Sequence, residues 1–75
     1  MTDEEFGEWG RAENRLRQQE MEGVASEADL KRVQAACAAR RKAAGLSAGE
    51  ASHAVVVGQR LDRGVPLYSA ISRSR

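Results

Sequence analysis

The residues best suited to covalent chemistry in this chain of 75 residues are one cysteine, Cys37, and one histidine, His53. A nucleophilic thiol needs a base within hydrogen-bond reach and a third group that orients that base. The two residues fall on different expected helices, so we interpret Cys37 as a buried thiol on an apolar face and His53 as a helix-surface residue. One cysteine and one histidine also provide neither an internal disulfide nor a zinc site. We therefore expect no catalytic residues, no metal and no cofactor.

The sequence also lacks the patterns by which small ligands are usually held. It contains no phosphate-binding loop and no dinucleotide fingerprint. Its many carboxylates form no distinguishable acid–base pair, since a glutamate-rich helix is usually a solvated face. We expect a binding protein with a macromolecular partner and no small-molecule substrate.

Charge divides the chain into two opposite halves. Residues 1–29 contain nine acidic and three basic side chains, a net charge of −6, whereas residues 30–75 contain nine basic and two acidic ones, a net charge of +7. A dedicated DNA-binding domain usually has a strongly basic total, but here the formal net charge is +1. Either the acidic helix folds against the basic helices and neutralises them, or each half binds a different partner. The acidic partner-binding residues would be Glu13, Glu20 and Glu22.

Three capping patterns predict the elements that carry these charges. A hydroxyl at Thr2, Ser26 or Ser47 is followed three residues later by a carboxylate, the arrangement that satisfies free amides in a first helical turn. Left-handed glycine stops are expected near Gly23 and at Gly45 and Gly64. The sequence therefore predicts an all-α fold in a single domain, 1–75, with three helices and a short fourth: about 3–22, 27–44, 48–63 and, after Pro66 at its first position, 66–72.

The apolar residues of these helices are few, so the core is expected to be thin. Gly7 and Gly10 should each weaken the first helix by about 1 kcal/mol, and Glu13 and Glu20 interrupt its apolar stripe. In the third helix, His53 lies opposite the core face, and the β-branched run 55–57 is also compatible with a strand. The expected core is Trp9, Leu30, Val33, Cys37, Val55, Leu61, Leu67 and Ile71. The rings of Phe6 and Trp9 are expected to be buried either in this core or in a partner's pocket.

The expected cellular compartment is inferred from two patterns that the sequence does not contain, a membrane-spanning run and a signal peptide. No apolar run approaches the roughly 20 residues that cross a bilayer, and the acidic start differs from a signal peptide. We expect a cytoplasmic protein that does not enter a membrane. A second copy of the chain remains one way to complete so small a core.

Two segments resemble the DNA-binding domains of phage-repressor-type helix-turn-helix regulators. Residues 40–51, RRKAAGLSAGEA, are similar to the junction of that family's first two helices, and residues 64–73, GVPLYSAISR, to its turn and recognition helix. Roughly four turns separate Ser47 from Gly64, whereas the family's second helix has about two. The resemblance implies phosphate contacts near Arg40 and Arg41 and a major-groove face with Tyr68, Ser69, Ser72 and Arg73. With the other cations of the basic half, the expected binding residues are Arg40, Arg41, Lys42, Arg60, Arg63, Tyr68 and Arg73.

The leading hypothesis is a small regulatory protein that acts on the transcription apparatus, through DNA or through polymerase-associated protein surfaces. Its alanine- and arginine-rich composition is typical of phage and plasmid accessory proteins. The alternatives are a protein-only inhibitor or adaptor without nucleic-acid contact, and a homodimer whose acidic and basic faces pair.

Overall fold

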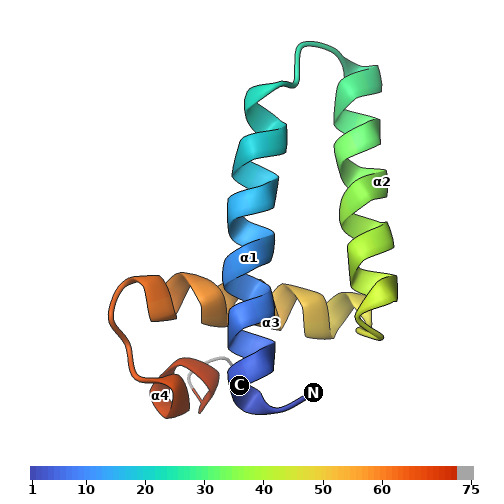
Figure 1. The fold of residues 1–75 in the computed structure, drawn as a ribbon. Helices are drawn as coiled ribbons and strands as arrows, with labels where there is room; N and C mark the ends of the chain where they lie inside the picture. Colours follow the sequence, from blue (N-terminus) through green and yellow to red (C-terminus); the bar gives the residue numbers. More distant parts are fainter. Residues whose placement is uncertain (73–75) are drawn as a thin grey trace.

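A computed structural model describes residues 1–72 of the chain as four helices (Figure 1). No strand occurs within these residues, and 55–57 lie inside the third helix, so the helical prediction for that run is confirmed. The predicted all-α class and the short fourth helix are also confirmed. The helices are α1 (Asp3–Glu22), α2 (Glu27–Ala43), α3 (Ala48–Asp62) and α4 (Leu67–Ser72).

The three predicted helix starts are all present. The Glu5 amide donates to Thr2 Oγ1 (3.1 Å), and the Thr2 amide donates to the Glu5 carboxylate (2.8 Å). The Ser47 box at the start of α3 has the same two bonds. At Ser26 the hydroxyl accepts from the Asp29 amide as predicted, but the Asp29 carboxylate accepts from the amide of Ala25 instead. A hydroxyl cap therefore begins each of the three long helices.

The predicted left-handed glycine stops are present except at Gly23, and α2 and α3 each end one residue before the predicted bound, while α4 begins one residue after Pro66. Gly45 and Gly64 adopt left-handed backbone angles, with φ of 73° and 88°. Gly23 has φ −89°, so its prediction as a left-handed stop was wrong. Its amide donates to the Glu20 carbonyl within an ordinary turn, which requires no positive φ.

Helices α1 and α2 form a hairpin, and α3 lies across it near the start of α1 (Figure 1). In Figure 1, α1 and α2 run antiparallel, α3 passes across the lower half of α1, and α4 lies beside the first turns of α1. Contacts between α1 and α3 dominate the tertiary structure, and α2 contacts α1 far less. The hairpin therefore projects beyond the packed part of the molecule.

The packed part is the crossing of α1 and α3, where two glycines let the backbones touch. A Cβ on Gly10 would lie 1.8 Å from the Ala54 carbonyl oxygen, and one on Gly58 would lie 2.5 Å from the Arg11 amide nitrogen. Asn14 reinforces the crossing by donating to the Val55 carbonyl (3.0 Å). The glycine at position 10, expected only as a helix-weakening residue, is required for this contact.

The close crossing also changes which residues are buried. The buried apolar residues are Leu46, Ala51, Ala54, Val57 and Ala70. Leu30, Val33 and Cys37 lie on α2, which packs little against the rest of the molecule. All eight residues expected in the core are only half-buried: Trp9, Leu30, Val33, Cys37, Val55, Leu61, Leu67 and Ile71.

His53 was also placed wrongly by the sequence. Its ring packs edge-on against Phe6, with ring centroids 5.3 Å apart, and one ring nitrogen lies 3.4 Å from the Ile71 carbonyl oxygen. The expected surface residue therefore belongs to the contact between α1, α3 and the end of α4.

Candidate functional site

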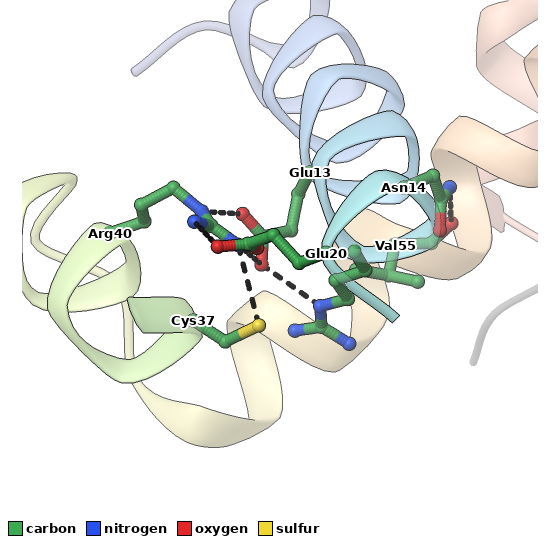
Figure 2. Close-up of polar contacts among 7 residues, drawn as sticks. Glu13, Asn14, Glu20, Cys37, Arg40 and Val55 are labelled. Carbon is green, nitrogen blue, oxygen red and sulfur yellow. Dashed lines mark hydrogen bonds and ion pairs between the residues drawn. The ribbon is translucent and has the colours of Figure 1, made fainter. Parts of the chain in front are cut away.

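A cluster of charged side chains joins α2 to α1 (Figure 2). Glu13 of α1 is only 1% exposed and accepts from Arg40 Nε of α2 at 2.6 Å. Arg40 also donates to Glu20 (2.7 Å), about two helical turns further along α1. Arg17 donates to the second oxygen of Glu13 at 2.9 Å. A buried carboxylate with two arginine partners therefore takes the place of an apolar contact between the two helices.

The cluster shifts the pKa values of its members. Burial acts to raise the pKa of Glu13, but hydrogen bonds from Arg40 and Arg17 outweigh burial and hold that pKa below its ordinary value. Bonds to Glu13 and Glu20 raise the pKa of Arg40. Burial and the neighbouring Glu13 raise the pKa of the Cys37 thiol. Cys37 is therefore protonated at neutral pH and poorly suited to nucleophilic attack.

Two of the three residues expected on an acidic partner-binding face belong to this cluster; the three are Glu13, Glu20 and Glu22. Glu13 is buried and Glu20 half-buried, both bonded to Arg40, while Glu22 at the end of α1 is exposed. Glu13 was thus expected at a partner-binding surface and is instead an internal residue. The reason is that Arg40 approaches from α2, which a helical projection of α1 alone cannot show. Internal neutralisation of the opposite charges is thus present at Arg40, whereas most other acidic side chains of α1 are exposed.

The expected basic site is only partly gathered on the surface. Arg41 donates to the Leu46 carbonyl at 3.0 Å, and Arg60 donates to the Ala70 carbonyl at 2.9 Å. Arg40 belongs to the cluster with Glu13. The remaining expected residues are Lys42, Arg63 and Tyr68, which are exposed, and Arg73, which lies outside the described residues.

A groove follows the hairpin instead, and the sequence did not predict it. Three hollows of about 520, 370 and 220 Å³ share Arg17 in their linings, and we refer to them together as the hairpin groove and singly as its sections, although the largest is lined by α1 and the end of α3 without a residue of α2. The largest lies toward the end of α3 and the other two lie between α1 and α2. The residues that line these sections include Arg15, Arg17, Met21, Leu30, Val33, Cys37, Arg41 and Arg63.

The middle section of the groove is apolar. Met21 is 47% exposed on α1, and Leu30, Val33 and Cys37 present one half-buried face of α2 toward it. None of the residues of α2, all of which the structure describes, is fully buried. The apolar face of α2 was visible in the sequence, but the sequence placed it in the core because the helix spacing of the hairpin was unknown.

Metal and membrane chemistry find no support in residues 1–72. Within this part of the chain, no group of three or more histidine, cysteine, aspartate or glutamate side chains is arranged to hold a metal ion. No helix among the described residues is both long enough and apolar enough to cross a bilayer. The candidate site consists of the hollows along the hairpin and at the adjoining end of α3.

Comparison with known proteins adds no relative, since no protein-family model, curated protein or solved structure matches this chain.

Proposed function

We propose that this chain is a small, non-catalytic regulatory protein that binds another protein through the α1–α2 hairpin. The observation that carries the proposal is the hairpin groove, whose apolar section is left uncovered by the described chain. Exposed apolar surface rimmed by polar side chains is typical of protein-binding sites.

The bonding of the arginines favours a protein partner over DNA. Sequence-independent DNA affinity depends on cations that can reach phosphates. Arg40, Arg41 and Arg60 donate to groups within the chain, so much of the expected basic surface already has partners. The hairpin, by contrast, offers both apolar and charged groups to an incoming chain.

The transcription apparatus is the setting in which we propose that the protein acts, on the basis of the helix-turn-helix resemblance. Contact with DNA is the second candidate function. It is favoured by one observation, the 82% exposure of Tyr68 on α4, together with the exposed cation Arg63 at the preceding turn.

Site-specific photo-crosslinking in cells of the source organism tests the two candidates. Benzoylphenylalanine is placed at position 21 in one variant and at position 68 in the other, so each variant serves as the control for the other. We expect a protein adduct from position 21 that survives nuclease treatment and a much weaker one from position 68. Adducts confined to position 68 and lost after nuclease treatment would establish DNA contact and refute the protein-binding proposal.

A further inference from the structure

We propose that the hairpin groove binds an acidic amphipathic helix of the partner protein. This inference rests on the proposed function and adds the chemistry of the partner. It follows from three features of the groove: its floor, its charged rim, and the way its sections join.

The floor has the spacing that a helix can match. Leu30, Val33 and Cys37 are separated by three and four residues, so they form one stripe along α2, and Met21 faces them from α1. Two antiparallel helices with an apolar furrow between them are the usual receptor for the apolar face of a third helix. A helix is also the element whose own backbone groups are already satisfied when it enters such a furrow.

The rim is basic. Arg15 and Arg63 are exposed in the section that lies toward the end of α3. Arg17 lines all three sections with a side chain that is 40% exposed. The acidic side chains beside the groove are each paired within the chain: Asp62 with Arg11, Glu20 with Arg40, and Asp29 with Arg32 in the hollow that adjoins Val33. The charge complement of this rim is a helix that carries carboxylates beside its apolar face.

A second copy of the chain is a poorer occupant. Its own acidic helical segment is the first turns of α1, where Asp3, Glu4 and Glu5 are exposed. The apolar side of those turns is already used, since Phe6 packs against His53 and Gly10 against α3. A partner helix whose apolar side is unoccupied fits the groove better.

The test uses the full chain and a synthetic peptide of about 20 residues, long enough to populate a helix. The peptide has leucine at every third or fourth position and glutamate elsewhere, and the control peptide has lysine in place of each glutamate. Two-dimensional amide spectra of the labelled protein are recorded during titration. We expect shifts at Met21, Leu30, Val33 and Cys37 with the acidic peptide, but not at Tyr68, and at least about tenfold weaker binding of the basic peptide.

Variants of exposed residues assign the binding to the rim and the floor. The double variant Arg15→Glu/Arg63→Glu and the variant Met21→Glu should each weaken binding of the acidic peptide by about tenfold or more. Lys42→Glu reverses a cation that lies outside the groove linings, and it should leave the affinity within about twofold of the parent. Circular dichroism verifies that each variant keeps its helices.

Three results would overturn the inference. One is equal binding of the two peptides or no binding up to about 1 mM. Another is a set of shifts centred on α4, and the last is a concentration-dependent dimer in sedimentation that fills the groove with a second copy. If crosslinks from position 21 still capture a protein after any of these results, the proposed protein binding stands and only the acidic-helix chemistry fails.

Discussion

The two sides of α1 make contacts of opposite kinds. Toward α3, Gly10 and Gly58 bring two backbones into direct contact around Ala54 and Val57, which are fully buried. Toward α2, the main link is the ion cluster of Arg40 with Glu13 and Glu20. The interface between α1 and α3 is closed, in the sense that its backbones touch and leave no space for a larger side chain at Gly10 or Gly58. The interface between α1 and α2 is polar and partly open, since hollows between the two helices are accessible from the surface.

The difference shows how a chain with few large apolar residues can still form a defined fold. Small residues at a helix crossing gain dispersion contacts through the backbone itself, which offsets part of the missing side-chain burial. The residues not consumed there, on the hairpin, remain accessible. The thin core and the open groove are thus two consequences of the same crossing.

The most severe test of the closed interface is Gly10→Ala. The added Cβ would lie 1.8 Å from a backbone oxygen, which cannot move aside as a side chain can. We expect a loss of about 3 kcal/mol or more in the free energy of unfolding, because the helices must move apart to accommodate the added methyl group. Thermal unfolding followed by circular dichroism measures it.

The matched control is Gly49→Ala, which makes the same change in α3. No atom lies within 4 Å of a Cβ added there. This variant should be neutral or stabilised by about 0.5–1 kcal/mol, the ordinary helix propensity difference. Equal melting temperatures for the two variants would show that the crossing is not closely packed.

The open interface should respond to Arg40→Met. Removing Arg40 leaves the buried Glu13 carboxylate with Arg17 as its remaining ion-pair partner. We expect a cost of about 2–3 kcal/mol, below the usual range for buried pairs because Arg17 stays in place and Arg40 is 26% exposed. The loss should be local. Hydrogen exchange should accelerate in α2 while the amides of α1 and α3 around Gly58 stay protected.

Arg32→Met provides the control on the same helix. Arg32 pairs with Asp29 at the surface, where such pairs contribute at most about 1 kcal/mol. Its exchange pattern should match that of the parent. Simultaneous loss of protection in all helices of the Arg40 variant would contradict the division of the molecule into a closed and an open interface.

Sequence reasoning predicted the helices well because their ends depend on local chemistry. The hydroxyl caps at Thr2, Ser26 and Ser47 and the left-handed glycines at 45 and 64 act within one turn, so they can be read without the rest of the fold. Gly23 shows the limit of this reading, since a glycine permits a left-handed turn without requiring one.

The core and the binding surface could not be read this way because they depend on how helices meet. Gly10 looked unfavourable in an isolated helix, and its value appears only where Ala54 lies against it. Glu13 looked like a solvated break in an apolar stripe, and only the approach of Arg40 from 27 positions away makes it a buried anchor. The groove at Arg17 had no local signal, since an arginine on a polar helix face is ordinary.

Acidification should weaken the contact between α1 and α2 before the contact between α1 and α3. We expect this effect to be smaller than those of Gly10→Ala and Arg40→Met. The pKa of Glu13 in the folded chain lies below its ordinary value of 4.5, so its contribution to stability is complete above that pH and is lost as the pH falls through the lower folded value. Glu5 and Glu50 also have lowered pKa values, caused by backbone hydrogen bonds at Thr2 and Ser47, so acid weakens the starts of α1 and α3 as well.

Glu13→Gln separates these contributions, because glutamine cannot titrate while the capping carboxylates still do. In the parent chain we expect the protection of the α2 amides, measured relative to their intrinsic exchange rates at each pH, to fall below about pH 4.5, before the amides at the α1–α3 crossing lose protection. In the variant, the α2 amides should be less protected than in the parent at pH 7, and their protection relative to the intrinsic rate should change less on acidification. A pH dependence of α2 that is the same in both proteins would mean that the capping carboxylates, and not the buried ion cluster, control how α2 stays on α1.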